Sequence, residues 1–425
     1  MNRRLFNYIA SSPTAYHACA HTAKMLKEAG YKELFENDTW KLKAGRGYFV
    51  RRNGSSVIAF RTPGADATGF IITASHSDSP CMKIKENPEI ADKYYVKLST
   101  ETYGGMIYSS WFDRPLAIAG RVTVKSEKGI EVKLVDTKQP VAIIPNVAIH
   151  MNRKINSGME YNAAVDMLPL FGGEKDSFKN NIAALAGASA EDIVTTDLFL
   201  YNPQEGYEWG DYISAPRLDD LQCAFASLTA FIESADALIV SSSIPVYALF
   251  DNEEVGSQTK QGAASTFLYD VLSRAAAALG KEFSPLVANS FMASCDNAHA
   301  IHPNHPEFSD RNHTVYMNGG IVIKYNANQK YTSDAVSVAL FKLVCDEAKT
   351  PVQYYANRAD MAGGSTLGNI ANTQVSLNTV DIGLPQLAMH SSFETAGKND
   401  TKHMVRALSK LYTKAIKATE NGYEL

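Results

Sequence analysis

The stretch GFIITASHSD, residues 69–78, is the part of the sequence that best indicates the fold of this chain. It begins as a run of apolar and β-branched residues, which is typical of a buried strand, and it ends in His76 and Asp78. Open α/β sheets bind their ligands beyond the carboxyl ends of the strands, where side chains converge outside the core. The stretch therefore predicts an α/β fold with a functional site at this edge of the sheet.

The same arrangement recurs further along the chain. Apolar runs at residues 244–250, 289–295 and 375–387 each lead into carboxylate or imidazole side chains, and RLDD at 217–220 places carboxylates at an expected helix start. One such residue alone is usually structural, but their joint placement favours a shared site. The residues brought together in this way are His76, Asp219, Glu253, Glu254, Asp296 and His390.

These side chains include a set of ligands for divalent metal ions. Two imidazoles and three carboxylates, without cysteine, suit Zn²⁺, Co²⁺ or Mn²⁺. Five ligands would crowd one zinc ion, whereas two ions that share a carboxylate would use all five, and a bridging hydroxide would bring the net charge to zero. Glu253 can remain free as a base, because successive side chains diverge. The ligand candidates are His76, Asp219, Glu254, Asp296 and His390.

The region between residues 94 and 144 interrupts the alternation of helix and strand patterns. Alternating apolar residues at 122–124 and 130–134 flank a turn at 126–129, which predicts a β-hairpin. We therefore predict two domains. A discontinuous α/β domain comprises residues 1–91 and 208–425, and an inserted β-rich domain comprises residues 92–207.

The composition excludes several functional classes. The 41 Lys and Arg and the 45 Asp and Glu give a net charge of −4, which provides no overall positive field for nucleic acid or an anionic membrane. No apolar run approaches the ~18 residues that span a bilayer. The five cysteines form no CxxC pair, so neither a disulfide framework nor a thiolate zinc site is indicated. We expect a soluble, cytoplasmic protein without nucleic-acid or membrane partners.

Two other motifs offer competing interpretations. His299, His302 and His305 resemble a zinc site in composition, but two prolines within the segment break the regular spacing, so a role in a wall or an interface is favoured. The glycine-rich stretch 363–368 lacks the lysine of a phosphate-binding P-loop. It predicts a close approach of the backbone to a site instead.

Five motifs in order along nearly the whole chain resemble those of the aspartyl aminopeptidase family of two-metal zinc peptidases. They are HSDSP (76–80), SAPRLDDL (214–221), DNEEVGS (251–257), CDNAHAIHPN (295–304) and LAMHS (387–391). The segment WFDRPLAIAGRV (111–122) and residues 146–150 also resemble the dimerisation domain of that family. The resemblance implies a mixed-sheet metallopeptidase catalytic domain with an inserted β-rich dimerisation domain.

The resemblance implies a role for each residue of the metal cluster. Asp219 would bridge two metal ions, for which zinc is the expected metal. The remaining ligands would bind one ion each in pairs, His76 with Glu254 and Asp296 with His390. Glu253 would be the general base that activates a metal-bridged hydroxide. Asp78 would lie behind the His76 imidazole and fix its tautomer.

The resemblance also implies an activity and an assembly. The chain would remove N-terminal residues, preferably Asp or Glu, from peptide substrates. It would form a homo-oligomer built from dimers, with a dodecamer expected, and His150 would reach the active site of the neighbouring subunit.

Two positions depart from the family pattern. The usual LDN reads Leu218-Asp219-Asp220, which adds a carboxylate near the site. Animal and fungal members carry Arg three residues after the final His, where this chain has Phe393. Selectivity for acidic residues would then depend on the metals and on Lys324, which is either an ordinary charge at a strand end or a side chain aimed into the cleft. The resemblance favours the second interpretation of Lys324.

Two alternative functions follow from the same residues. A metal pair of this kind can hydrolyse any amide, so a metallo-carboxypeptidase or deacylase on a related scaffold is one alternative. A catalytically silent assembly or cargo protein with this fold is the other. The presence of all five ligands and the base argues against the silent protein.

Overall fold

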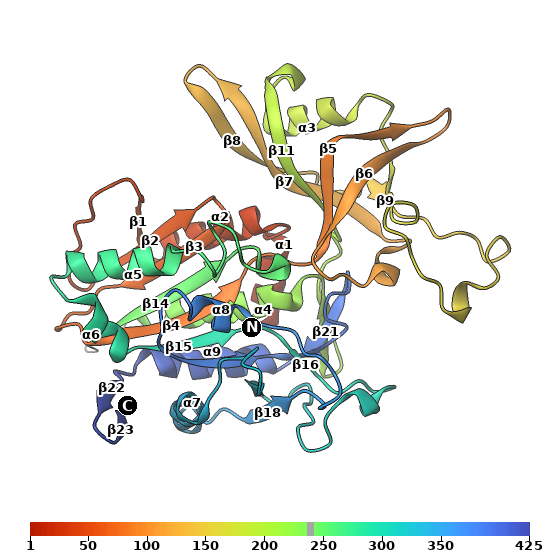
Figure 1. Cartoon of the computed structure of the whole chain (residues 1–425). Helices are drawn as coiled ribbons and strands as arrows, with labels where there is room; N and C mark the ends of the chain where they lie inside the picture. Colours follow the sequence, from red (N-terminus) through yellow and green to blue (C-terminus); the bar gives the residue numbers. More distant parts are fainter. Residues whose placement is uncertain (236–241) are drawn as a thin grey trace.

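The computed structural model of the chain describes residues 1–235 and 242–425 (Figure 1). In these residues the larger sheet has nine strands and mixed directions, as the predicted α/β, mixed-sheet fold class requires. Its central strands β14, β4, β15 and β19 are parallel, whereas β3 runs antiparallel to both of its neighbours and β17 runs antiparallel to β19 and parallel to β18. The strand order is β1 (Lys32–Leu34), β2 (Gly47–Arg52), β3 (Ser56–Arg61), β14 (Ser243–Phe250), β4 (Gly69–His76), β15 (Phe291–Cys295), β19 (Asn378–Gly383), β17 (Ile321–Tyr325) and β18 (Val352–Ala356).

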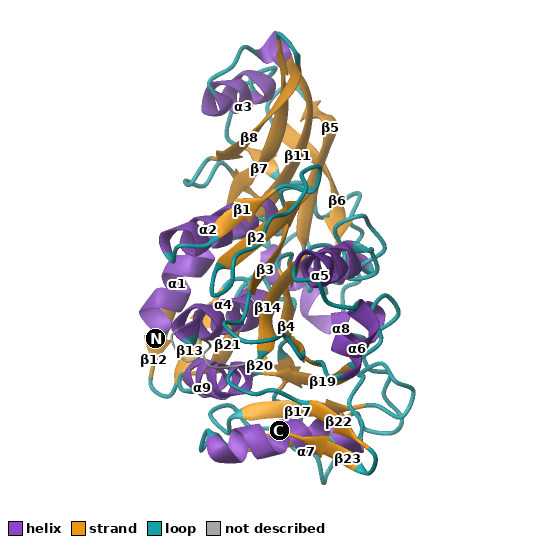
Figure 2. Cartoon of the chain, turned by 90° about the vertical axis from the view of Figure 1, so that its left-hand side faces the viewer, coloured by secondary structure: helices purple, strands orange, loops and turns teal. Residues whose placement is uncertain are grey.

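Helices cover both faces of this sheet (Figure 2). Strand β4 shows why two cores form, because its alternate side chains enter different clusters: Ile71 packs with the first helix group and Ile72 with the second. The first group is α1 (Asn2–Ala10), α2 (Ala15–Glu28), α4 (Leu218–Glu233), α7 (Ala335–Glu347) and α9 (Asp400–Tyr412). The second group is α5 (Phe267–Ala278), α6 (Phe283–Ala288) and α8 (Leu367–Ala371).

A second sheet stands at one end of the molecule (Figures 1 and 2). Strand β7 pairs with β11 as well as with β8 and β9, so the sheet closes on itself as a barrel around its own apolar core. The predicted hairpin is confirmed, with Ser126 opposite Gly129 at its turn. The strands and the helix packed on them are β5 (Cys81–Ala91), β6 (Val96–Tyr103), β7 (Pro115–Ser126), β8 (Gly129–Asp136), β9 (Ala142–Ile143), β10 (Leu170–Phe171), β11 (Ile193–Tyr201) and α3 (Phe178–Ala186).

The strands of the second sheet extend from Cys81 to Tyr201, so β5 belongs to it although β5 precedes residue 92. The division into domains at 91/92 and 207/208 stays a prediction. The short segment between β4 and β5, residues 77–80, is the first of two connections between the sheets. A change in the second sheet can therefore reach the carboxyl end of β4 through only a few residues.

A smaller sheet lies beside the carboxyl ends of the central strands. Its strands are β12 (Tyr207–Trp209), β13 (Tyr212–Ala215), β21 (Glu394–Gly397), β20 (Pro385–Leu387) and β16 (Ala298–His299). A terminal hairpin joins β22 (Lys417–Thr419) to β23 (Gly422–Glu424). Over the residues that the structure describes, no helix is long and apolar enough to cross a membrane.

Candidate active site

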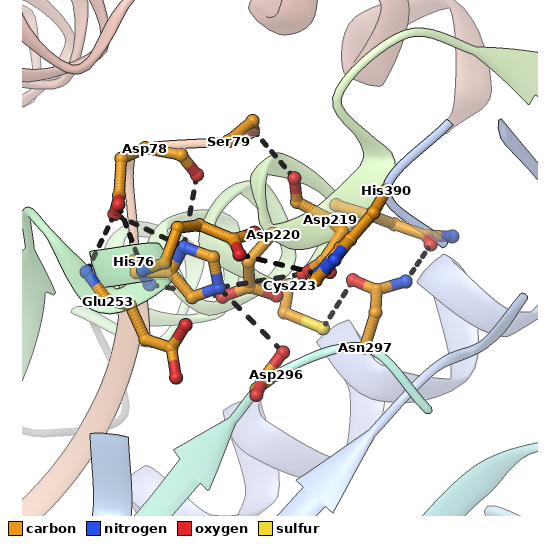
Figure 3. A network of polar contacts seen from close by, with 12 residues as sticks. His76, Asp78, Ser79, Asp219, Asp220, Cys223, Glu253, Asp296, Asn297 and His390 are labelled. Atoms are coloured by element: carbon orange, nitrogen blue, oxygen red, sulfur yellow. Dashed lines mark hydrogen bonds and ion pairs between the residues drawn. The ribbon is translucent and has the colours of Figure 1, made fainter. Parts of the chain in front are cut away.

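The carboxyl ends of three adjacent parallel strands form one side of a polar cluster (Figure 3). His76 is the last residue of β4, and it lies opposite Phe250 at the end of β14. Glu253 and Glu254 follow β14 in the 3₁₀ turn Glu253–Val255, and Asp296 follows β15. The strand ends therefore meet as the sequence pattern predicted, because parallel neighbours finish at the same edge.

Two further residues enter this cluster from outside the central strands. Asp219 lies in the first turn of α4, and its peptide bond to Asp220 is cis. His390 lies in the loop between β20 and β21. The structure thus brings together all six residues that the strand-end pattern singled out.

Asp219 stands between the two imidazoles. Its Oδ1 lies 3.5 Å from Nε2 of His76, and its Oδ2 lies 3.4 Å from Nε2 of His390. Among the described residues it belongs to two separate groups of closely spaced ligand atoms, one with His76 and one with His390. This is the position that a carboxylate shared between two ions would occupy.

The nearest carboxylates of the two imidazoles favour a division of the other ligands that differs from the predicted one. Nε2 of His76 lies 3.8 Å from Oδ1 of Asp296, whereas Nε2 of His390 lies 3.4 Å from Oε2 of Glu254. Strand β4 lies between β14 and β15, so the Glu253–Glu254 turn after β14 and Asp296 after β15 both lie next to His76. Among the described residues, two groups of close ligand atoms include Asp219, one with His76 and Asp296 and one with His390 and Glu254, and a third group joins His76 to Glu253 and Glu254.

The donor set fits two divalent cations. Oδ1 of Asp219 and Oε1 of Glu254 are buried without a hydrogen-bond partner, which is costly for carboxylate oxygens unless a cation binds them. The surplus of negative charge also acts on the imidazoles. Although burial opposes it, contact with Asp219 and the nearby Glu254 raises the pKa of His390 to about 10. Two imidazoles and three carboxylates in this arrangement are typical ligands of zinc and similar ions.

Glu253 borders the His76 side of the cluster. Burial raises the pKa of its carboxyl to about 8, although the adjacent His76 opposes this shift. A carboxyl group whose pKa lies near neutrality can both accept and return a proton. The position and the pKa of Glu253 therefore suit a general base.

Asp78 contacts more residues of the site than His76, the one contact that was predicted. Nδ1 of His76 lies 3.1 Å from the backbone carbonyl oxygen of Asp78 and 3.4 Å from its carboxylate. The same carboxylate accepts hydrogen bonds from the backbone N–H groups of Glu253 and Glu254, both at 3.1 Å, and from the Tyr103 hydroxyl at 2.7 Å. Asp78 thus fixes the backbone of both glutamates as well as lying behind His76.

Two buried carboxylates that the strand pattern did not single out also support the ligands. Asp220 accepts a hydrogen bond from the backbone N–H of His76 at 3.1 Å, and burial raises its pKa. Glu394 accepts from the backbone N–H groups of Asp219 at 3.0 Å and His390 at 2.8 Å. Asp220 was visible in the sequence as a departure from LDN. Glu394 carried no signal, because it begins β21 and no apolar run precedes it.

A cavity of about 270 Å³ opens next to the metal cluster. Gly364, Ser365 and Thr366 form part of its wall, in agreement with the close backbone approach predicted for residues 363–368. His299 also lines the cavity, whereas the exposed rings of His302 and His305 lie 5.4 Å apart outside it. Over the described residues the three histidines do not form a metal group.

Lys324 lines this cavity, but its ammonium group is buried and partnered. Nζ donates to the backbone carbonyl oxygen of Asn297 at 2.7 Å and lies 3.6 Å from Oδ2 of Asp296. Although burial opposes it, the charge of Asp296 raises the pKa of Lys324, so the lysine carries its positive charge at neutral pH. Lys324 is aimed at the site, and it is not a solvated charge at a strand end.

His150 and Phe393 lie outside the walls of the cavity. His150 is exposed in the long segment 144–169 between β9 and β10, which Figure 1 shows extending away from the catalytic sheet. Phe393 stacks on Tyr207 with ring centroids 5.8 Å apart, and the Arg114 guanidinium lies 5.8 Å from the ring centroid of Phe393. Within one chain, neither residue contacts the metal cluster.

Known proteins share both the sequence and the fold. The probable M18 family aminopeptidase 2 of Clostridium acetobutylicum is 43% identical over 427 residues, which cover 96% of this chain and 98% of that protein. A chain of the Ape4 and Nbr1 complex superposes with a TM-score of 0.93 at 33% identity and covers 96% of this chain and 85% of its own. A chain of the S. cerevisiae mApe1 dodecamer superposes with a TM-score of 0.85 at 28% identity, and the match covers 96% of this chain and 95% of that chain.

The family model for the aminopeptidase I zinc metalloproteases, M18, matches residues 8–412. This range contains both sheets and every residue of the metal cluster. Because the match spans nearly the whole chain and the relatives agree with it, the chain belongs to the M18 family and is a metalloaminopeptidase.

Proposed function

We propose that this metalloaminopeptidase holds two divalent ions per chain, with zinc as the expected metal, and removes N-terminal Asp or Glu from peptides. The observation that carries the two-ion proposal is the placement of Asp219, whose two carboxylate oxygens face different imidazoles. One group would be His76, Asp219 and Asp296. The other would be Asp219, Glu254 and His390.

The side chains of the site would have different roles in peptide hydrolysis. When bound, the two ions supply Lewis acidity and lower the pKa of water. Glu253 accepts a proton from the attacking water and returns it to the leaving amine. Asp78 keeps the Glu253 backbone in place through the hydrogen bond from its N–H, and it lies behind His76 so that Nε2 faces the cluster.

Charge in the cavity supports the preference for acidic residues. A substrate carboxylate that enters beside the ligand carboxylates needs a positive partner, because an unpaired buried charge is costly. Lys324 is the charged lysine in the cavity wall, and its ammonium group lies 3.6 Å from Oδ2 of Asp296, which also lines the cavity. We assign the selectivity to Lys324 together with the ions.

The likeness to the S. cerevisiae mApe1 dodecamer, at 28% identity, supports a homo-oligomer built from dimers. We propose a dodecamer in which His150 of one subunit completes the site of its neighbour. We also propose a cytoplasmic location, which agrees with five cysteines that are all free, four of them buried.

A panel of peptides tests this function. Substrates with N-terminal Asp, Glu, Ala or Leu are compared before and after chelation and after addition of defined amounts of Zn²⁺, Co²⁺ or Mn²⁺. We expect hydrolysis to require about two ions per chain and to favour Asp and Glu. A protein that prefers Leu over Asp contradicts the proposed selectivity, and full activity with one ion contradicts the proposed pair.

N-acetylated versions of the same peptides separate the aminopeptidase from the deacylase and carboxypeptidase alternatives. An aminopeptidase needs the free amine and should cleave only the unmodified peptide. Cleavage of the acetylated peptide at an equal rate would favour the alternatives.

A further inference from the structure

A short segment that leaves the second sheet passes directly beside the metal cluster. Strand β6 ends at Tyr103, and Gly104 and Gly105 follow it before the 3₁₀ helix Tyr108–Trp111. Three contacts join this segment to three different parts of the cluster, and each contact involves a different residue of the segment. The barrel and the metal site are therefore in direct contact, in addition to the covalent connections between them.

The first contact is the hydrogen bond from the Tyr103 hydroxyl to Oδ2 of Asp78 at 2.7 Å. The Tyr103 oxygen in turn accepts from Nδ2 of Asn252 at 2.8 Å. Because the Asn252 amide can only donate at that atom, the Tyr103 proton must go to Asp78. Oδ1 of Asn252 accepts from Thr259 and Gln261, which fixes the orientation of the amide.

This chain of hydrogen bonds fixes the Asp78 carboxylate together with the backbone of the two glutamates. Oδ2 of Asp78 also accepts from the backbone N–H of Glu254, and Oδ1 accepts from the backbone N–H of Glu253. A rotation of the carboxylate would break these bonds together. The orientation of Asp78, and with it the position of the Glu253–Glu254 turn, therefore depends on the Tyr103 hydroxyl.

The second contact is between Gly105 and His390. Nδ1 of His390 lies 2.8 Å from the Gly105 carbonyl oxygen, which can only accept, so Nδ1 carries a proton and Nε2 is the nitrogen that faces the cluster. The backbone N–H of Ile107 donates to the carbonyl oxygen of His390 at 3.0 Å. The segment thus holds both the ring and the backbone of this ligand.

The third contact is the packing of Gly104 against Glu254. A Cβ placed on Gly104 would lie 3.1 Å from Cβ of Glu254, and the φ of Gly104 is +73°, a conformation that favours glycine. The segment therefore comes as close to this ligand as a residue without a side chain allows.

From these contacts we propose that Tyr103 is a positioning residue of the active centre, and that the segment 103–107 makes the second sheet a structural part of the metal site. The expected effect on kcat rests on the proposed function. The expected effect on metal binding follows from the contacts alone. Groups that orient metal ligands typically change metal affinity or activity by about 10- to 100-fold when they are removed.

Tyr103→Phe removes only the hydroxyl and keeps the ring that packs edge-on against Phe199. The matched control is Tyr94→Phe, because Tyr94 is 76% exposed just before the same strand and lies far from the cluster in the fold. For both variants and the parent protein, we would measure kcat and KM for an N-terminal Asp peptide. We would also measure Zn²⁺ affinity by competition with a chelator, the visible absorption spectrum of the Co²⁺-substituted protein, and the melting temperature.

We expect Tyr103→Phe to lower kcat by about 10- to 100-fold with KM changed less than about threefold, and to shift the Co²⁺ spectrum or weaken Zn²⁺ binding. Tyr94→Phe should match the parent in all five measured quantities. A Tyr103→Phe protein with a lower melting temperature but unchanged kcat, Zn²⁺ affinity and Co²⁺ spectrum would show a structural residue only and would overturn the proposal.

The readouts on the ions separate this proposal from the proposed function. If the parent protein binds Co²⁺ but cleaves no N-terminal residue, the proposed function fails, while the spectrum of Tyr103→Phe still decides the role of Tyr103. Gly104→Ala provides an independent test on the same segment. It should weaken Zn²⁺ binding through the contact with Glu254, and unchanged binding would count against the segment as part of the metal site.

Discussion

At the scale of single residues, the site is built from acidic groups whose environments differ. Asp219 is buried between two imidazoles, and although burial opposes it, the close contact with His390 and His76 holds its pKa well below the ordinary range. At Glu253 the effect of burial prevails, and it raises the pKa of this carboxyl group to about 8. Neighbouring carboxyl groups of one site thus have pKa values shifted in opposite directions, which agrees with the proposed roles of Asp219 as a ligand and Glu253 as a base.

Glu253→Gln tests this assignment of roles. The amide keeps the size of the side chain and some hydrogen bonding, but it cannot accept a proton from water, so kcat should fall by roughly 10² to 10⁴. Metal content should stay at the level of the parent protein, as measured by elemental analysis. Glu127→Gln in the exposed turn between β7 and β8 is the control and should be fully active. Normal turnover of Glu253→Gln would remove this residue from the mechanism.

Lys324→Met tests the origin of acidic selectivity. Loss of the ammonium group should lower kcat/KM for N-terminal Asp and Glu by roughly 10- to 100-fold more than for Ala or Leu, because a charge-assisted hydrogen bond is lost. Lys330→Met, at an exposed position of the loop after β17, is the matched control. An equal loss for all four substrates would mean that Lys324 acts only by holding Asp296, from which its Nζ is 3.6 Å away.

At the scale of helices and strands, local sequence patterns identify single elements but not how those elements pair. An apolar run followed by a polar residue identifies a strand end, so His76, Glu254 and Asp296 could be found from the sequence. The pattern does not give strand order, and the pairing of Asp296 with His76 depends on β15 lying next to β4. Tyr103 was missed for a related reason, because it contacts Asp78 from another sheet.

The start of α9 offers a pH test at this scale. Asp400 is fully buried and accepts hydrogen bonds from the backbone N–H groups of Asn318 and Gly320, and burial raises its pKa to about 6. Below pH ~3 the group is protonated in both the folded and the unfolded chain. As the pH rises to about 6, the unfolded chain loses the proton first, so stability should fall by roughly 3 kcal/mol.

Asp400→Asn removes this titration while keeping a similar shape. The melting temperature of the variant should therefore decline less than that of the parent protein between pH 4 and 6, whatever its absolute value. Both proteins are measured free of metal, so that loss of ions at low pH does not contribute. Parallel declines in the two proteins would contradict the assignment of this step to Asp400.

At the scale of the whole molecule, the second sheet has two relations to the active centre. Within one chain its segment 103–107 contacts the metal ligands. Its long segment 144–169 extends away from the catalytic sheet and leaves His150 exposed (Figure 1). An exposed imidazole on such a segment can contribute to catalysis only if another subunit receives it.

His150→Ala should lower turnover while preserving metal content and oligomer size, measured by elemental analysis and light scattering. The exposed His302 provides the control variant His302→Ala, which should remain active. Mixing His150→Ala chains with Glu253→Gln chains gives the sharper test. In a mixed dimer the site with an intact Glu253 receives the intact His150 of its partner, so random pairing should restore about a quarter of the parent activity. If mixing is demonstrated by mass and no activity returns, His150 does not act across a subunit interface.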